Sequence, residues 1–318
     1  MGNGIVNSRS GQSPFTLPHP TMSSRAVAWT GQAFDYDGRP VRVLAYDVLP
    51  SGWTEELTEL HEQTGGSQHF IDIASRRYAC DEVLRCITHP SSIVLEIGCS
   101  SGFLLKELIE TLPGHCVVGA DYTIGTLEAL GRQLPGVPLV QFDLTRCPLA
   151  DDFADVVVLL NVLEHIGDDE AAMTQLFRIV KPGGAVIIEL PAEPSLFDVY
   201  DRVLLHHRRY TMRSLTAALE RHGFVVERRS HLGFILYPLF YLAKRLNQLR
   251  YPTGRDIDEK RLVAGMIATT RKSSALMNFV MRCEHVLRRH FYLPLGIRCL
   301  VTCRRTVFQK NTDRAPLC

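Results

Sequence analysis

The sequence predicts an α/β fold, doubly wound around a mostly parallel, seven-stranded sheet. The first observation behind this prediction is that short apolar runs alternate with segments of helix length between residues 91 and 230. Buried parallel strands have this appearance because helices cover both faces of their sheet. The second observation is that the helical segments end on proline and glycine, which stop helices. The composition agrees, since 46% hydrophobic and 22% charged residues are typical of a globular chain.

Six apolar runs supply the strands of the central region, and a seventh strand follows much later in the chain. The predicted strands cover residues 93–97, 116–120, 138–142, 155–160, 185–190, 224–227 and 296–303. The last strand has to return to the sheet. We therefore expect the region before it to be an insertion rather than a separate domain.

Helices are predicted between these strands and upstream of them. They cover residues 55–62, 71–87, 102–112, 123–134, 168–180 and 211–222. Thr211 is a suitable N-cap for the last of these helices, and Gly223 ends it. The two upstream helices would lie over the strand tips as an N-terminal cover.

These elements divide the chain into six segments. They are a disordered arm (1–25), the N-terminal helical cover (26–90), the α/β domain (91–231), a helical cap insertion (232–294), the closing strand (295–308) and a tail (309–318). The arm is expected to be disordered because it is rich in Ser, Gly, Pro and Asn, and it lacks the apolar stretch of a signal peptide. The longest uncharged run of the cap, residues 232–243, is too short to cross a bilayer, which takes about 20 helical residues.

Charge is distributed unevenly along the chain. The formal net charge of +1 conceals 19 basic and 29 acidic residues up to residue 243, followed by 16 basic and 5 acidic residues. Such an asymmetry suggests nucleic acid or a membrane surface as a partner. Placed on the predicted fold, it indicates a basic lid beside a small-molecule pocket and leaves a peripheral membrane contact open.

The nine cysteines are scattered, without a Cys-x-x-Cys pair or a paired Cys/His spacing. This distribution suits reduced thiols in a cytoplasmic protein. On the same grounds we expect no metal site.

The loop after the first central strand carries the strongest local pattern. Glu96, Gly98, Ser100 and Gly102 occupy every second position there. Glycines at 98 and 102 let the chain turn sharply into the next helix and bring backbone N–H groups close to a ligand. Alone, such a loop is shared by several nucleotide-binding folds.

Polar residues at the ends of the next three strands sharpen this prediction. Asp121 follows the second strand, where a carboxylate can accept both hydroxyls of a ribose, and Asp143 follows the third, within reach of an adenine amino group. Asn161 follows the fourth strand. A nicotinamide-binding loop would instead need Gly-x-Gly-x-x-Gly, which the chain lacks at this position.

With these residues, the sequence resembles the class I S-adenosylmethionine-dependent methyltransferases over residues 70–230 and the last strand. The resemblance implies a Rossmann-like domain that binds S-adenosylmethionine and releases S-adenosylhomocysteine. It assigns cofactor contacts to Glu96, Gly98, Ser100, Gly102, Asp121, Tyr122, Asp143, Leu144 and Asn161. Ser100 departs from the family pattern, which has glycine there, so we expect altered loop detail and retained binding.

A second segment, after the fifth strand, is similar to the His-x-Arg-Arg-Tyr segment of bacterial small-molecule methyltransferases. It implies that His206, Arg208, Arg209 and Tyr210 face the substrate pocket. The carboxyl end of a doubly wound sheet is where such folds bind ligands. The alternative is a solvated basic turn before a helix.

Two histidines are candidate catalytic residues. His165, at the tip of the fourth strand, and His206 have side chains whose ordinary pKa suits a base at neutral pH. The alternative for His165 is packing within its loop. Glu164 is expected to support that loop.

The expected reaction is methyl transfer to a small, apolar or amphipathic acceptor, O-methylation being favoured over N- or C-methylation. Natural-product or glycolipid-type metabolism would supply such acceptors. The fourth-strand motif lacks the Pro-Pro-aromatic sequence of enzymes that methylate nucleic-acid amino groups. Two alternatives stay open, a nucleic-acid methyltransferase that uses the basic C-terminal segment and a non-catalytic cofactor-binding protein.

Overall fold

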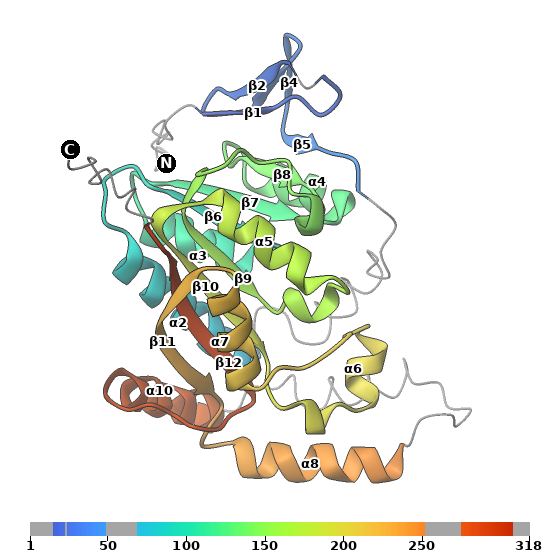
Figure 1. Ribbon diagram of the computed structural model, residues 1–318, viewed down its shortest axis with the longest axis vertical. Coiled ribbons are helices and arrows are strands. Elements are labelled where there is room, and N and C mark those ends of the chain that lie inside the picture. Colours follow the sequence, from blue (N-terminus) through green and yellow to red (C-terminus); the bar gives the residue numbers. More distant parts are fainter. Residues whose placement is uncertain (1–14, 23, 49–68, 252–274, 308–318) are drawn as a thin grey trace, which may run out of the picture.

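The computed structural model describes residues 15–22, 24–48, 69–251 and 275–307. Its centre is an eight-stranded sheet in the order β11-β12-β10-β9-β6-β7-β8-β5 (Figure 1). The strands are β5 (Val43–Ala45), β6 (Ile93–Ile97), β7 (Cys116–Asp121), β8 (Leu139–Gln141), β9 (Ala154–Leu160), β10 (Val180–Pro191), β11 (Phe224–Leu232) and β12 (Arg298–Arg305). Neighbours from β5 to β10 run parallel, and β12 pairs antiparallel with both β10 and β11.

The doubly wound, mostly parallel α/β fold is confirmed, and the closing strand returns into the sheet between β10 and β11. The predicted strand count of seven is wrong, because β5 adds an eighth strand at the edge. β5 pairs with β8 from Val43 opposite Leu139 to Ala45 opposite Gln141. A run of three residues is too short to show a strand pattern in the sequence.

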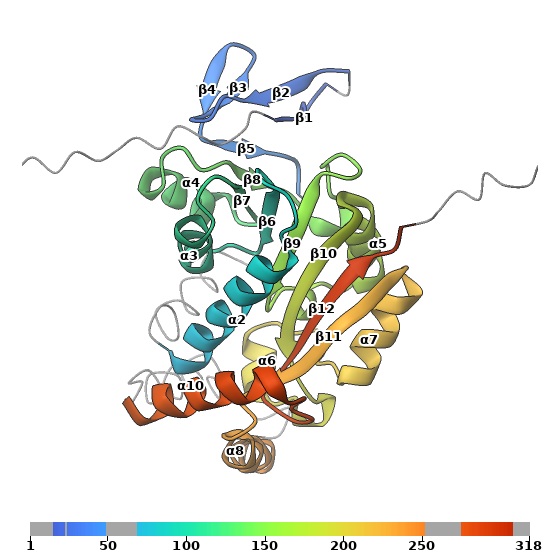
Figure 2. The same cartoon turned by 90° about the vertical axis from the view of Figure 1, so that its left-hand side faces the viewer.

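Helices cover both faces of the sheet (Figure 2). They are α2 (Phe70–Cys86), α3 (Phe103–Thr111) and α4 (Ile124–Gln133) on one face, and α5 (Asp169–Ile179) and α7 (Met212–Arg221) on the other. Alternate strand residues enter two separate cores: Val94 packs with the first group of helices, and Leu95 with the second. Burial on both faces explains why the strands have continuous apolar sequences.

The N-terminal region differs from its prediction. Strands β1 (Thr16–Pro18), β2 (Ala26–Trp29), β3 (Phe34–Tyr36) and β4 (Arg39–Val41) form an antiparallel four-stranded sheet. Part of the segment expected to be a disordered arm, residues 15–22, therefore belongs to an ordered sheet, because Leu17, Trp29 and Phe34 bury one another's apolar surface. The expected helix over 55–62, the first residues of the arm and the tail lie outside the described residues.

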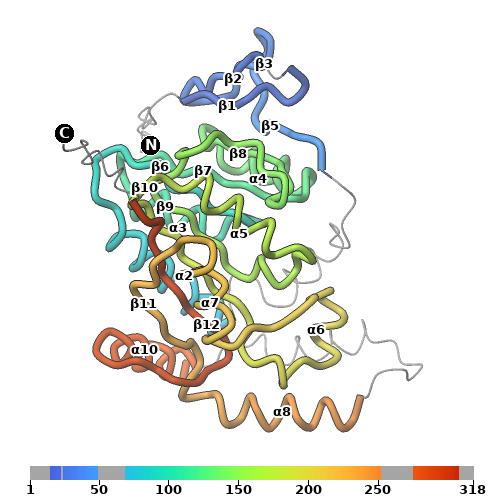
Figure 3. The backbone as a smooth tube through the Cα atoms, viewed as in Figure 1, coloured from blue at the N-terminus to red at the C-terminus, as the bar shows by residue number. Residues whose placement is uncertain are grey.

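Between β11 and β12, the described part of the chain contains two cap helices. They are α8 (Tyr237–Arg250) and α10 (Ala275–His290), and they lie near the end of the sheet where β11 stops (Figures 1 and 3). Helix α10 packs against α2. Within the described residues, no helix has both the length and the apolar character needed to cross a membrane.

Ion pairs between the two parts of the chain compensate some of its uneven charge. Basic side chains of the C-terminal part form ion pairs with acids that precede residue 243. The pairs are Lys244 with Asp198 and Asp201, Arg289 with Asp81, Arg298 with Asp72 and Glu189, Arg304 with Glu227, and Arg305 with Asp152. Five of the sixteen basic residues of the C-terminal part therefore pair with acids elsewhere in the fold.

Candidate active site

The loop from β6 to α3 has the tight geometry that its glycines predict. Gly98 and Gly102 adopt φ angles of +80° and +73°, which favour glycine. A Cβ atom on Gly98 would lie 2.5 Å from Cγ2 of Val162, and one on Gly102 would lie 2.5 Å from a methyl group of Leu130. The loop therefore touches the segment after β9. Ser100, which replaces the family's glycine, has a positive φ of +45°.

Asp121 at the end of β7 ties this loop to the next strand. Its Oδ2 accepts a hydrogen bond of 2.9 Å from the Ser100 backbone N–H, and its Oδ1 accepts from the N–H and the hydroxyl of Thr123. Each carboxylate oxygen has two lone pairs. Oδ2 therefore keeps room for one further donor, such as a ribose hydroxyl.

Glu96 offers a buried acceptor at the base of the loop. Its Oε2 is buried and has no hydrogen-bond partner among the described residues. Burial first, and then the charges of Asp121 and Glu107, raise the pKa of Glu96 well above its ordinary value. A bound ammonium group would supply the missing donor and charge. The methionine amino group of S-adenosylmethionine has this chemistry, so these residues fit the cofactor that the resemblance implies.

The remaining predicted cofactor residues lie at the same edge of the sheet. Asp143 caps the short helix η1 (Leu144–Arg146) through Oδ1, which accepts from the N–H and hydroxyl of Thr145, each at 2.8 Å. Leu144 is buried in the core, and Tyr122 is half-buried. Asn161 follows β9 with a φ of +54°. The structure thus brings the ends of β6, β7, β8 and β9 together.

The two candidate catalytic histidines lie side by side, with ring centroids 4.7 Å apart. Nδ1 of His206 lies 2.8 Å from Oδ1 of Asp201. A carboxylate on Nδ1 leaves Nε2 of the neutral imidazole with its lone pair free to accept a proton. Burial lowers the pKa of His206, although the bond to Asp201 opposes this effect, so the ring is neutral at physiological pH.

Glu164 completes this cluster. The side chain is fully buried, and neither carboxyl oxygen has a hydrogen-bond partner among the described residues. Burial raises the pKa of Glu164 to about 8, so the carboxyl is largely protonated at neutral pH. Glu164 belongs to the short helix η2 (Leu163–His165).

The same three side chains could hold a divalent cation. The ligand atoms of Glu164, His165 and His206 lie within 4.8 Å of one another, and two histidines with one glutamate are a donor set that zinc accepts. This group contradicts the expectation, drawn from the cysteine spacings, that the chain offers no metal site. The group has no local spacing pattern in the sequence, because His206 lies on a different loop from Glu164 and His165.

Arg208 and Tyr210, which were predicted to contact substrate, both bind the N-terminal turn of α5. The Arg208 guanidinium pairs with Asp169 and donates to the Gly167 carbonyl at 2.5 Å. The Tyr210 hydroxyl donates to the other oxygen of Asp169 at 2.5 Å. Both side chains thus anchor their loop to α5.

Arg209 points inward to Asp201. Its Nε donates to Oδ1 of Asp201 at 2.7 Å, and its side chain is buried. Lys244 of α8 approaches the same cluster, with Nζ 2.7 Å from Asp198 and 3.3 Å from Asp201. Neither Asp198 nor Lys244 was foreseen, because the two residues are far apart in the sequence and only the cap brings them together.

Comparisons with known proteins found similar sequences and similar structures. A family model described as a methyltransferase domain matches residues 68–229, about half of the chain. The chain is 32% identical over 136 residues to a probable S-adenosylmethionine-dependent methyltransferase of Mycolicibacterium smegmatis, covering 42% of this chain and 52% of that protein. It is 31% identical over 143 residues to a demethylmenaquinone methyltransferase of Streptomyces avermitilis, covering 45% of this chain and 61% of the relative.

The chain thus spans between half and two thirds of the length of these relatives. Among solved structures, it is similar to a putative sarcosine dimethylglycine methyltransferase from Galdieria sulphuraria. The TM-score is 0.55 at 13% identity, over 79% of this chain and 99% of the other. At this identity the likeness shows the fold alone.

Proposed function

The chain belongs to the methyltransferase domain family, and on this premise we propose that it transfers a methyl group from S-adenosylmethionine to a hydroxyl oxygen of a small, apolar or amphipathic acceptor. The main observation for this proposal is the Asp201–His206 pair beside His165. Asp201 orients the neutral His206 ring so that it can act as a base. Val162 connects this pair to the loop from β6 to α3. The side chain of Val162 lies close to Gly98, and the backbone carbonyl of Val162 accepts a hydrogen bond of 3.0 Å from the His165 N–H.

S-adenosylmethionine, when bound, supplies an electrophilic methyl group on a sulfonium. Glu96 and Asp121 would hold its ammonium and ribose, and the loop backbone orients both. Nε2 of His206 would accept the proton that the acceptor hydroxyl loses on methylation, and S-adenosylhomocysteine would be the leaving thioether. The carboxylate of Asp201 stabilises the imidazolium that results. Most of the acceleration comes from holding donor and acceptor in line and away from water.

We assign a positioning role to Arg208, Arg209 and Tyr210. Their polar atoms are engaged by Asp169 and Asp201, so they fix the loop that carries His206. His165 packs edge-on against the His206 ring and limits its rotation. The acceptor pocket itself would be closed on one side by the apolar start of the cap, where Phe234 and Ile235 are exposed.

Cofactor binding is tested by titrating the protein with S-adenosylhomocysteine in a calorimeter. Glu96→Gln keeps the shape of the side chain but removes the negative charge that pairs with an ammonium group. We therefore expect the affinity for S-adenosylhomocysteine to fall by about tenfold. Glu128→Gln on the exposed side of α4 is the matched control and should bind as the unmodified protein does. Equal affinity for the two variants would contradict the role of Glu96.

The acceptor class is tested with radiolabelled S-adenosylmethionine and a panel of phenols, alkyl alcohols, amines, RNA and DNA. Demethylmenaquinone is included because relatives carry its name. We expect transfer to hydroxyl acceptors. Transfer to nucleic acid that falls with rising salt would establish the nucleic-acid alternative. Tight S-adenosylhomocysteine binding without transfer to any acceptor would support a non-catalytic protein.

A further inference from the structure

Helix α8 exposes its apolar side and buries a charged side chain. Its only buried side chain is that of Lys244, whereas Leu239, Leu242, Leu246 and Leu249 are between 55% and 79% exposed. Helices on the surface of water-soluble domains usually turn such a stripe of leucines, spaced three or four residues apart, toward the core. Here the apolar stripe faces away from the protein.

Polar bonds hold α8 in this orientation. Lys244 pairs with Asp198, and the Asn247 amide donates to the other oxygen of that carboxylate at 3.3 Å. The Gln248 amide donates to the carbonyls of Ser195 and Phe197 at 2.8 and 2.9 Å. These partners fix which side of the helix meets the protein, so the exposure of the leucines follows from specific contacts.

Helix α10 extends the apolar surface. It buries Glu284 and Arg288 together with Met281, while Leu276 and Phe279 are each 63% exposed. The exposed rings of Phe291 and Tyr292 follow directly after the helix. Figures 1 and 2 both place α8 and α10 at the same end of the molecule. We call the exposed apolar residues of α8, α10 and 291–295 the cap face.

The two described segments that carry the cap face are rich in basic residues. Residues 232–251 and 275–295 contain six lysines and arginines but only one acidic residue, Glu284. That carboxylate is buried and accepts hydrogen bonds from the backbone N–H groups of Gly233 and Ile235. Arg250 is exposed next to Leu249, whereas the exposed guanidinium of Arg289 pairs with Asp81 of α2.

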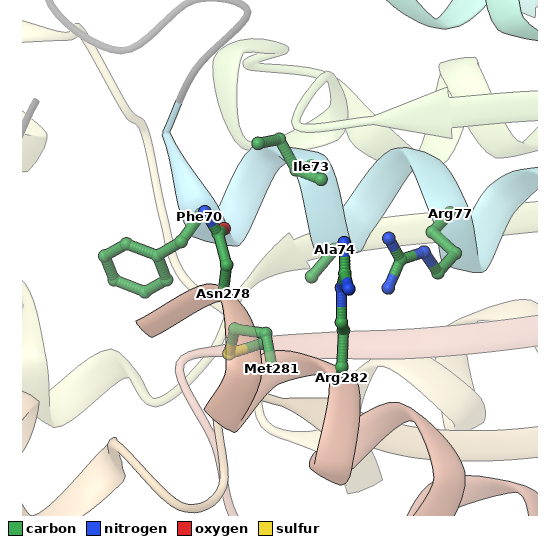
Figure 4. A pocket seen from close by; sticks show the side chains of 7 residues that line it. All are labelled: Phe70, Ile73, Ala74, Arg77, Asn278, Met281 and Arg282. Atoms are coloured by element: carbon green, nitrogen blue, oxygen red, sulfur yellow. The ribbon is translucent and has the colours of Figure 1, made fainter. Parts of the chain in front are cut away.

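A hollow between α2 and α10 adds one further cation, Arg77, to these six. Its lining includes Arg77 and Arg282, whose guanidinium groups lie near each other in Figure 4. Phe70 and Met281 contribute apolar lining. An anionic headgroup would find both charge and apolar contact there.

We propose that the cap face docks on an anionic lipid bilayer, with the leucines of α8 inserted among the lipid chains and arginines at the headgroups. An amphipathic helix with an apolar stripe and neighbouring cations binds in the plane of the interface, and anionic lipids add attraction for each cation near the surface. The occupant is a membrane rather than a protein groove because the leucine stripe lies on the outward side of α8, and because basic residues outnumber acidic ones in the two described segments that carry the cap face.

Docking would bear on the active site through Lys244. Its ammonium contacts Asp201, the same carboxylate that orients His206. If the proposed function holds, the bilayer lies beside the acceptor pocket and an amphipathic acceptor can enter from it. Only this step rests on the proposed function; the docking of α8 does not.

The test is flotation of the full chain with vesicles, without cofactor or acceptor. One preparation is phosphatidylcholine alone, and the other contains one part phosphatidylglycerol to two parts phosphatidylcholine. We expect binding to the anionic vesicles that weakens with salt. Leu246→Glu and Leu249→Glu should each reduce it at least about tenfold, since each removes a large apolar side chain from the lipid and adds a negative charge.

Val225→Glu is the matched control. Val225 is 54% exposed, against 55% for Leu246, and it lies at the end of β11 opposite to α8. This variant should float as the unmodified protein does, and circular dichroism should show equal melting temperatures for all variants. Arg245→Glu with Arg250→Glu should remove the preference for anionic vesicles.

Two results would overturn the proposal. The first is an unmodified protein that stays at the bottom of the gradient with either vesicle preparation. The second is Leu246→Glu and Leu249→Glu floating with unchanged affinity. A dimer in light scattering that Leu249→Glu dissociates, without any flotation, would assign the cap face to a second copy of the chain. Because no turnover is measured, these outcomes are independent of the proposed methyl transfer.

Discussion

Nδ1 of His206 lies 2.8 Å from Oδ1 of Asp201, and that carboxylate is shared with Arg209 and Lys244. Burial alone would raise the pKa of Asp201. The bond from His206 and the charges of Lys244 and Arg209 outweigh burial and hold the pKa well below its ordinary range. Asp201 is therefore ionised at any pH at which the protein is studied, and it gives His206 a fixed orientation.

The first prediction concerns this pair. His206→Asn should lower kcat by a factor of about 10²–10⁴, the usual contribution of a general base, with unchanged affinity for S-adenosylhomocysteine. His207→Asn is the control, because His207 is exposed in the same segment. Both variants are assayed with the hydroxyl acceptor that the panel identifies. A fall in kcat shared equally by the two variants would contradict base catalysis by His206.

The Asp201→Asn variant tests whether Asp201 acts on His206 through its charge or only through packing. Removing the carboxylate charge lowers the pKa of His206, since Asp201 is what opposes the effect of burial. The acidic limb of the kcat–pH profile should therefore move to lower pH in this variant. A purely structural Asp201 would change the height of the profile but leave its limb in place. Circular dichroism confirms that the protein measured is folded.

The second prediction uses Glu164. Its pKa is raised to about 8 in the folded protein, whereas an exposed glutamate titrates near 4.3. Between these values Glu164 binds more protons in the folded than in the unfolded state, so its contribution to stability is greatest at low pH and falls as the pH rises toward 8. Glu164→Gln should flatten this dependence. Melting temperatures of cofactor-free protein from pH 5 to about pH 9 check it.

An equal slope for Glu164→Gln and the unmodified protein would mean that Glu164 is already ionised near neutral pH. Such a result would direct attention to a cation held by Glu164, His165 and His206. Metal analysis of the purified protein would then distinguish a bound ion from a solvated carboxylate.

The third prediction concerns the cofactor loop. Ser100 holds a positive φ of +45°, a conformation that costs a non-glycine residue about 1 kcal/mol. Ser100→Gly should stabilise the protein by up to that amount and preserve S-adenosylhomocysteine binding, because the hydrogen bond from residue 100 to Asp121 uses the backbone. Gly98→Ala should do the opposite, since its Cβ would lie 2.5 Å from Val162. Calorimetric titration and thermal melting measure both effects.

Local patterns predicted the α/β domain well. The strands and the loop with Gly98 and Gly102 could be foreseen because hydrophobic periodicity and tight turns are encoded by neighbouring residues. The position of Asp121 and Asp143 at one edge of the sheet could be predicted, because parallel strands end at the same edge. The N-terminal sheet was missed, since its strands of three or four residues are too short to show a periodicity.

The sequence patterns could not predict contacts between residues that are far apart in the chain. The bond between Lys244 and Asp201 joins a cap helix to the short helix α6 (Val199–Val203), 43 residues earlier, and periodicity carries no information on such partners. The same holds for the direction that α8 faces. Its leucines share one side by spacing, but only the contacts of Lys244 and Gln248 decide that this side points outward.

The fourth prediction compares two arginines of β12. Arg298 pairs with Asp72 and with Glu189, whose side chain is fully buried. Arg304 pairs with Glu227 at the surface, where both side chains are partly exposed. Breaking a buried pair leaves an uncompensated charge and costs about 3–5 kcal/mol, whereas a surface pair contributes about 0–1 kcal/mol. Arg298→Ala should therefore destabilise the protein far more than Arg304→Ala in urea unfolding.

The pH dependence of Arg298→Ala gives a second measure of the same pair. Burial raises the pKa of Glu189, and Arg298 is the leading influence that lowers it. Without Arg298 the folded-state pKa rises further, so the loss of stability should grow as the pH rises above the ordinary pKa of glutamate. Adding Glu189→Gln removes the unpaired charge and should restore most of the lost stability. A double variant as unstable as Arg298→Ala would show that the packing of the Arg298 side chain, rather than its charge, stabilises the junction between β10, β12 and α2.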